Sequence, residues 1–144
     1  MVCKKMAGNI LMVVDAQGGG LGRQLITMIR KEIPAMHIIA VGTNSIATSA
    51  MRKAGADEAA TGENAVKVVC KKADVIIGPL GMVIADAMLG EITPGMACAI
   101  AQADAKRIMI PFSNCDNYIA GVSDFSTGRL IADAVEQLKS MTGR

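Results

Sequence analysis

The residues in this sequence with the clearest chemistry form a glycine-rich turn, Gly18-Gly19-Gly20-Leu21-Gly22. A tight turn from a strand into a helix needs residues that tolerate positive φ, and a bulky phosphate needs backbone N–H groups that no side chain covers. The first turn of the following helix adds unpaired donors and a partial positive charge. Arg23, directly after the turn, would add a charge-assisted contact. The turn therefore predicts a binding site for a nucleotide or another phosphate-bearing small molecule.

The spacing of these glycines is close to the dinucleotide-binding fingerprint G-x-G-x-x-G, but neither possible alignment completes it. With Gly22 as the last glycine, Gln17 takes the first position, and with Gly18 as the first glycine, Arg23 takes the last. No Gly-Lys-Ser/Thr follows, which disfavours a P-loop NTPase. The alternative is that the glycines only let the first helix pack closely on the sheet. Their position between a strand and a helix in the first βα unit favours ligand binding.

Two further loops are predicted to complete the site. The second strand leads into Thr43 and Asn44, which can hydrogen-bond a ribose or a 2′-phosphate, but no acid is present there to hold a ribose diol. Ordinary NAD recognition is therefore disfavoured. The loop that contains Gly78, Pro79 and Gly81 would form the opposite wall of the site.

Asp15 is a candidate ligand-binding residue, and Glu63 and Cys115 are candidates for catalysis; each of the three has a structural alternative. Asp15, at the end of the first strand, can orient a ligand hydroxyl or hold a metal with substrate, but support of the turn is favoured. Glu63 is the best candidate general base, although an acid that complements a helix dipole is the simpler interpretation. Cys115 is a nucleophile only if its thiolate is stabilised, and its Asn- and Asp-rich loop favours turn formation. His37, the only histidine, is predicted at the opposite end of the sheet, which disfavours a Cys–His couple.

Short apolar runs alternate with amphipathic stretches along the chain, as expected for strands buried on both faces and separated by helices. The expected strands cover residues 10–14, 37–42, 57–61, 74–78 and 107–111, with a short sixth strand over 118–122 near an edge. The expected helices run from the glycine turn to Pro34 and then over 45–53, 61–70, 82–89, 93–103 and 130–141. The predicted N-caps are Ser45, Thr61 and Thr93.

Strands that alternate with helices predict parallel pairing with right-handed crossovers. We therefore expect an α/β fold, a three-layer Rossmann-like domain with a mainly parallel sheet of five or six strands, as a single domain over residues 1–144. A strand order of 3-2-1-4-5 would place the ligand site between the loops after Val14 and Gly78, where the order reverses.

Hydrophobic residues make up 51% of the chain and charged residues 19%, which favours a sheet buried on both faces, a subunit interface, or both. The apolar segment that begins at Met82 is expected to be covered by a second subunit, so a homo-oligomer is predicted. A net charge of +2 without a basic stripe, together with 2% aromatic residues, argues against nucleic-acid binding.

The four cysteines match no zinc motif, so no metal site is expected, and they indicate reduced thiols in a cytoplasmic protein. The longest apolar stretch falls short of a membrane span, so no membrane partner is expected.

Four segments together resemble an uncharacterised family of short, single-domain Rossmann-like proteins from anaerobic bacteria. This resemblance implies the fold and a cytoplasmic single domain, but no activity and no functional residues. The segments are Val13 to Gly22, Gly42 to Met51, Ala60 to Ala65 and Ala85 to Pro94.

The leading prediction is therefore a binding module for a nucleotide or phosphorylated metabolite. The cofactor is not identified by the sequence, and NAD(P) or another nucleotide fits the turn. One alternative is a small homo-oligomeric NAD(P)-dependent oxidoreductase, although the sequence has no Tyr-x-x-x-Lys pair. The other is a structural subunit of a larger assembly, which the apolar segments favour.

Overall fold

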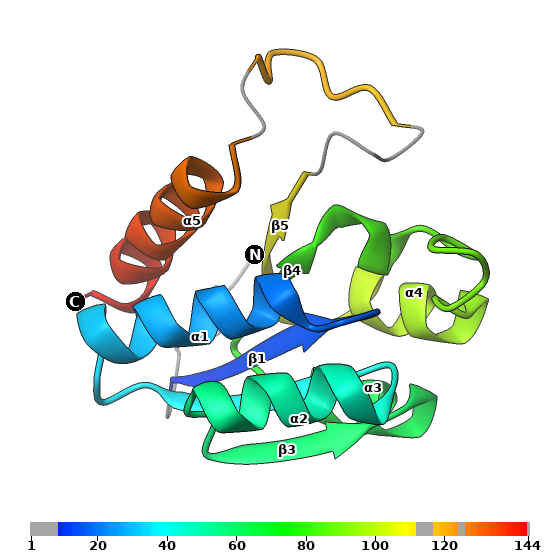
Figure 1. Cartoon of the computed structure of the whole chain (residues 1–144), viewed down its shortest axis with the longest axis horizontal. Helices are drawn as coiled ribbons and strands as arrows, with labels where there is room; N and C mark the ends of the chain where they lie inside the picture. The colour runs from blue at the N-terminus through cyan, green and yellow to red at the C-terminus, as the bar shows by residue number, and fades with distance from the viewer. Residues whose placement is uncertain (1–8, 112–116, 124–125, 144) are drawn as a thin grey trace.

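The structure is a computed structural model that describes residues 9–111, 117–123 and 126–143. Its centre is a five-stranded sheet in the order β3-β2-β1-β4-β5, with all neighbouring strands parallel (Figure 1). This confirms the predicted fold class and strand order. The strands are β1 (Ile10–Asp15), β2 (His37–Gly42), β3 (Glu58–Thr61), β4 (Val75–Pro79) and β5 (Lys106–Ile110).

Helices cover both faces of the sheet, which gives three layers. Side chains of β1 alternate between two hydrophobic clusters: Leu11 and Val13 pack with α1, α2 and α5, whereas Met12 and Val14 pack with α3 and α4. This alternation follows from the period of two residues in a strand. The helices are α1 (Gly20–Glu32), α2 (Ser45–Ala54), α3 (Glu63–Cys70), the 3-10 helix η1 (Leu80–Val83), α4 (Pro94–Ala101) and α5 (Thr127–Thr142).

The helix starts differ from prediction at two of the three expected caps. Thr93 caps α4 as predicted, because its hydroxyl accepts a hydrogen bond of 3.1 Å from the Met96 amide. Asn44, not Ser45, caps α2, because the Asn44 Oδ1 accepts a hydrogen bond of 2.9 Å from the Ala47 amide. Thr61 is the last residue of β3, and Gly62 (φ 101°) occupies the cap position of α3.

The predicted helix over residues 82–89 is wrong. Only η1 is helical there, and the chain then continues through turns in which Asp86, Met88 and Leu89 have φ values of 64°, 57° and 58°. Left-handed backbone cannot continue a right-handed helix. Two hydrogen bonds, from the Asp86 amide to the Ile92 carbonyl (2.8 Å) and from the Ile92 amide to the Ala87 carbonyl (3.2 Å), close this segment into a compact loop.

The predicted sixth strand over residues 118–122 is also absent. Residues 117–123 form no strand, and Tyr118 is exposed. Gly121 has a φ of 86°, and the Val122 amide donates to the Ile119 carbonyl (3.2 Å), so this stretch forms a turn instead of pairing with β5.

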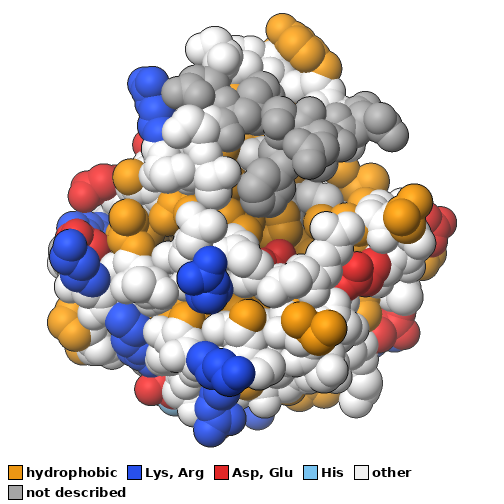
Figure 2. Space-filling model, viewed as in Figure 1, with side chains coloured by type: hydrophobic (Ala, Val, Ile, Leu, Met, Phe, Trp, Pro, Cys, Tyr) orange, Lys and Arg blue, Asp and Glu red, His pale blue; other side chains and the backbone are white. Residues whose placement is uncertain are grey.

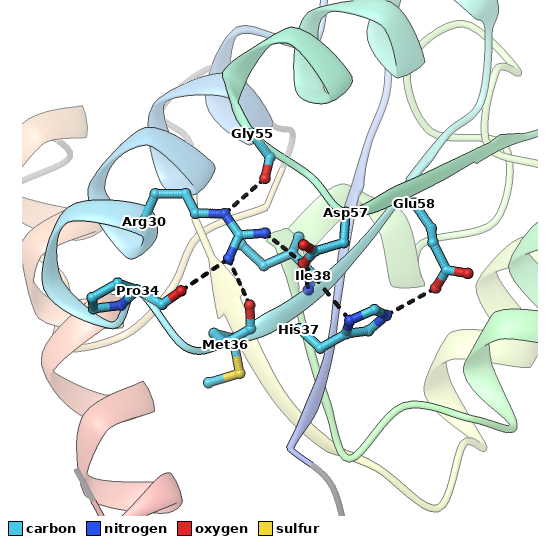
Figure 3. A network of polar contacts seen from close by, with 8 residues as sticks. All are labelled: Arg30, Pro34, Met36, His37, Ile38, Gly55, Asp57 and Glu58. Atoms are coloured by element: carbon cyan, nitrogen blue, oxygen red, sulfur yellow. Dashed lines mark hydrogen bonds and ion pairs between the residues drawn. The ribbon is translucent and has the colours of Figure 1, made fainter.

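A polar network joins α1 to the amino ends of β2 and β3 (Figure 3). The Arg30 guanidinium donates to the carbonyls of Gly55 (2.7 Å) and Met36 (2.6 Å) and pairs with Asp57 (2.5 Å). Burial raises the pKa of Asp57, but the Ile38 amide and Arg30 outweigh it and hold that pKa below its usual value. The network therefore holds together the amino-terminal end of the sheet, opposite the end that carries the glycine turn.

His37 is the first residue of β2, as predicted, and it also belongs to this network. Its Nε2 is 2.9 Å from a carboxylate oxygen of Glu58, and its Nδ1 is 3.8 Å from Asp57.

Among the described helices, none is long and apolar enough to cross a membrane. Within the same residues, no group of three or more His, Cys, Asp or Glu side chains is placed to hold a metal.

Candidate functional site

A cavity of about 660 Å³ opens at the carboxyl ends of β1 and β4. One wall is the glycine turn from Asp15 to Leu21, and another is formed by Pro79, Gly81 and the loop of residues 84–88. The strand order places the reversal point of the sheet between β1 and β4, where ligands bind in open α/β sheets. The cavity volume of about 660 Å³ lies within the range of small-molecule sites.

Asp15 shapes the glycine turn from within. Only 5% of the residue is exposed, and its two carboxylate oxygens accept from the Ala16 amide (2.8 Å) and the Gly22 amide (2.7 Å). Burial raises the pKa of Asp15, and these two hydrogen bonds oppose that rise. The contacts favour structural support of the turn over the other roles considered for Asp15.

The backbone amides of the turn fall into two groups. The Gly19 amide donates to the Ala16 carbonyl (3.0 Å), and the Gly22 amide is taken by Asp15. For the amides of Gly18, Gly20 and Leu21, the described residues provide no acceptor. Gly20 and Leu21 begin α1, so their N–H groups are among the donors that a helix leaves unpaired at its start.

The glycines divide in the same way by the space around them. A Cβ atom on Gly19 (φ 73°) would lie 2.8 Å from the Ala47 Cα, and one on Gly22 would lie 2.5 Å from the Met51 Sδ. A Cβ on Gly18 or Gly20 would meet no atom within 4 Å. Close packing therefore accounts for Gly19 and Gly22, whereas Gly18 and Gly20 leave open space beside two unpaired amides.

Glu91 holds the turn against the end of β2, a role that no sequence pattern indicated. Its Oε1 accepts from the Gln17 amide (2.7 Å), the Thr43 hydroxyl (2.5 Å) and the Asn44 side-chain amide (2.7 Å). Burial raises the pKa of Glu91, but these donors, Thr43 foremost, outweigh burial and hold the pKa below its usual value. Glu91 is therefore an ionised acceptor at neutral pH.

Thr43 and Asn44, the predicted ribose ligands, do not line the cavity. Besides its contact with Glu91, the Asn44 Nδ2 donates to the Gln17 carbonyl (2.9 Å), while its Oδ1 caps α2. The side chains of both residues thus serve the junction between the two loops.

Of the four other predicted site residues, Pro79 and Gly81 line the cavity, whereas Arg23 and Gly78 do not. Arg23 lies on the outer surface of α1, in a shallow groove that includes Ser45 and Lys53. Figure 2 shows Lys and Arg side chains over the face that α1 and α2 form. Gly78 is buried in the sheet, where a Cβ would lie 2.4 Å from the Val14 carbonyl oxygen.

Of the two candidate catalytic residues, only Glu63 lies among the described residues, and it does not line the cavity. Glu63 is the first residue of α3, accepts from the Thr93 hydroxyl and lies 3.4 Å from the Lys67 Nζ. The Thr93 hydrogen bond lowers the pKa of Glu63, which weakens it as a base. Cys115 lies outside the described residues.

The charged side chains among the described lining residues are both acidic: Asp15 and Asp86. No described Lys or Arg lines the cavity. An anion in this cavity would therefore be held by backbone amides and by the partial positive charge at the start of α1.

The family described as "Domain of unknown function (DUF3842)" matches residues 10–143. No curated protein sequence matches this chain. Among solved structures, the chain is similar to a dodecameric FMN-dependent Ubix-like decarboxylase from Escherichia coli O157:H7. The TM-score is 0.52 and the identity 15%, over 94% of this chain and 95% of that chain. It is also similar to AibC, with a TM-score of 0.46 and 18% identity, over 95% of this chain and 43% of that chain.

Proposed function

The chain belongs to the DUF3842 family, and from its cavity we propose that it binds a nucleotide or another phosphorylated small molecule. In this proposal the amides of Gly18, Gly20 and Leu21 donate to the phosphate. The source of the protein among anaerobic bacteria and its cytoplasmic location stay predictions from the sequence.

The observation that carries the proposal is the pairing of open space with unpaired donors. Neither packing nor a positive φ requires glycine at positions 18 and 20, because an added Cβ would meet nothing within 4 Å at either one. A ligand that approaches the backbone closely does require it. The cavity volume of about 660 Å³ leaves room for a ligand of nucleotide size.

The likeness to the FMN-dependent decarboxylase supports the fold, and it places FMN among the ligands to be tested. FMN carries a phosphate, as do the adenine and guanine nucleotides and NAD(P). The proposal stops at binding, because Glu63 lies away from the cavity and both oxygens of Asp15 are engaged. The alternative function is an NAD(P)-dependent oxidoreductase, and binding of NAD(P) would favour it.

A homo-oligomer is proposed on two grounds. The decarboxylase is described as dodecameric, and Leu89 is fully exposed at the tip of the loop after η1. Light scattering tests this: an oligomer that Leu89→Asp dissociates supports it, and a wild-type monomer at micromolar concentration contradicts it.

The test of binding compares two glycine-to-valine variants. Thermal shift and calorimetry with ADP, GDP, NAD⁺, NADP⁺ and FMN should show at least one ligand for the wild type. Gly20→Val should abolish that binding, because the new side chain enters the space beside the amides. Gly128→Val is the matched control, since Gly128 also lies in the first turn of a helix, in open surroundings, but outside the cavity lining. No binding by the wild type, or full binding by Gly20→Val, would contradict the proposal.

A further inference from the structure

Among the described residues, hydrogen-bond donors reach one of the two carboxylate oxygens of Glu91. Oε1 accepts all three hydrogen bonds that hold the loops together, and no described residue donates to Oε2. Glu91 is half-buried, and among the described side chains no buried nitrogen or oxygen lacks a partner. Oε2 therefore reaches solvent, as an unused acceptor beside the glycine turn.

The position of Glu91 matters because of what it is bonded to. Thr43 directly follows β2, and Gln17, whose amide donates to the same carboxylate, lines the cavity. Glu91 therefore brings a carboxylate to the carboxyl end of β2, where the sequence after that strand supplies none. In nucleotide-binding α/β folds, an acid at this place accepts hydrogen bonds from ribose hydroxyls.

We propose that Glu91 binds the ribose of the ligand through Oε2, so that the site selects ribonucleotides over 2′-deoxyribonucleotides. This inference rests on the proposed function, because it places the phosphate of the same ligand on the amides of Gly18, Gly20 and Leu21. It adds the sugar as a second recognised group. Glu91 itself does not line the cavity, so the ribose would extend past Gln17, which lines the cavity and is bonded to Glu91.

The backbone around Glu91 is built to hold it there. Asp86, Met88 and Leu89 have left-handed φ values, which cost free energy in non-glycine residues and persist where the surroundings enforce them. The Glu91 amide donates to the Met88 carbonyl (3.2 Å), which ties the residue to this unusual loop. Together with the three bonds to Oε1, this fixes the direction of the carboxylate before a ligand arrives.

Charge supports the same assignment. A hydroxyl group donates well to an ionised carboxylate, and the lowered pKa of Glu91 keeps it ionised at neutral pH. A 2′-phosphate at the same place would meet a like charge, with no described Lys or Arg in the lining to offset it. NAD⁺ should therefore bind more tightly than NADP⁺ if the ligand is a dinucleotide.

The substitution Glu91→Gln isolates the role of Oε2. The glutamine carbonyl oxygen can still accept from Gln17, Thr43 and Asn44, while an NH₂ group, which only donates, replaces the free oxygen. Thr43→Val is the matched control, because it removes one donor to Oε1 and leaves Oε2 unchanged. Both variants alter the junction, but only Glu91→Gln removes the proposed ribose acceptor.

Calorimetry with ribo- and 2′-deoxyribonucleoside diphosphates of all four bases provides the measurement. The wild type and Thr43→Val should both favour the ribose form of the bound nucleotide by about 10- to 100-fold, the value of one hydrogen bond to a charged group. In Glu91→Gln, binding of the ribose form should weaken to within about 3-fold of the deoxy form, while binding of the deoxy form changes little.

Two results would overturn the assignment of Glu91. One is a wild type without ribose preference, and the other is a preference that survives in Glu91→Gln. If no nucleoside diphosphate binds while FMN or orthophosphate binds in a Gly20-dependent way, the phosphate site stands and the ribose assignment fails. If Gly20→Val leaves the binding of these probes intact, the proposed function fails instead.

Discussion

Replacing Gly20 by alanine should stabilise the protein and weaken ligand binding at the same time. Gly20 is the first residue of α1 and lacks a positive φ, and an added Cβ would meet no atom within 4 Å. Alanine at a compatible position stabilises proteins by about 0.4–1 kcal/mol, because it restricts the unfolded chain. The same methyl group would enter the space through which a phosphate approaches the Gly20 and Leu21 amides.

Gly19→Ala should have the opposite effect on stability. Its φ of 73° is left-handed, which costs an alanine about 1–2 kcal/mol. The new Cβ would also lie 2.8 Å from the Ala47 Cα, a backbone atom that cannot rotate away, and such overpacking costs roughly 1–3 kcal/mol. The expected loss is therefore about 2–5 kcal/mol.

Urea denaturation and thermal denaturation, both without ligand, measure the two variants. Since 1 kcal/mol corresponds to roughly 4 °C in Tm for a chain of this size, Gly20→Ala should melt up to about 4 °C higher than the wild type. Gly19→Ala should melt about 8 °C lower or more. If Gly20→Ala instead lowers the free energy of unfolding by about 1 kcal/mol or more, the fold itself requires that glycine. The open space at Gly20 would then no longer indicate a ligand.

Three further predictions concern the rest of the molecule. Thr93→Ala should destabilise the protein by about 1 kcal/mol in urea denaturation, because it removes the cap of α4; an unchanged midpoint would contradict that role. Asp57, whose pKa in the folded protein lies below its ordinary value of 3.8, contributes stability that is complete above that value and is lost as pH falls through the lower folded pKa. Stability should therefore drop below about pH 4, and Asp57→Asn should flatten that part of the pH profile; an equally steep profile would refute the assignment. Burial raises the pKa of Cys70 to about 11, whereas Cys98 is exposed, so iodoacetamide at pH 8 should label Cys98 and leave Cys70 unmodified in peptide mass spectrometry of the folded protein. Equal labelling of the two would show that Cys70 is accessible.

The sheet was predictable from the sequence because its strands are buried on both faces. Continuous apolar runs such as Leu11 to Val14 have no other favourable place in a chain of this size. Helices that alternate with such runs leave parallel pairing as the simple solution, and the observed order β3-β2-β1-β4-β5 follows. The cap of α4 was equally clear, since Thr93 and Pro94 both favour a helix start.

The sequence after β4 wrongly predicts a helix, because no residue pattern there indicates the turns that the chain forms. Met82 and Ile92 are apolar and buried, as in a helix, but Met88 and Leu89 take left-handed backbone that these residue types rarely adopt, and Asp86 takes it as well. Tertiary contacts override local preference there. The role of Glu91 could not be predicted for the same reason. It accepts a hydrogen bond from the Gln17 amide, 74 residues away, and no local spacing indicates that contact.

The glycine turn was recognised, but its residues could not be separated by sequence. The packing interpretation fits Gly19 and Gly22, and the ligand interpretation fits Gly18 and Gly20. This difference depends on whether Ala47 or Met51 lies opposite each glycine, which only the packing of α2 against α1 determines.

The most direct test of the phosphate site is an amide NMR titration of the ¹⁵N-labelled protein with the tightest ligand from the panel. The resonances of Gly18, Gly20 and Leu21 should shift most, because their N–H groups have no acceptor among the described residues before the phosphate arrives. The Gly19 and Gly22 amides, already bonded to Ala16 and Asp15, should shift less. A ligand that binds and leaves the first three resonances unmoved would contradict the account.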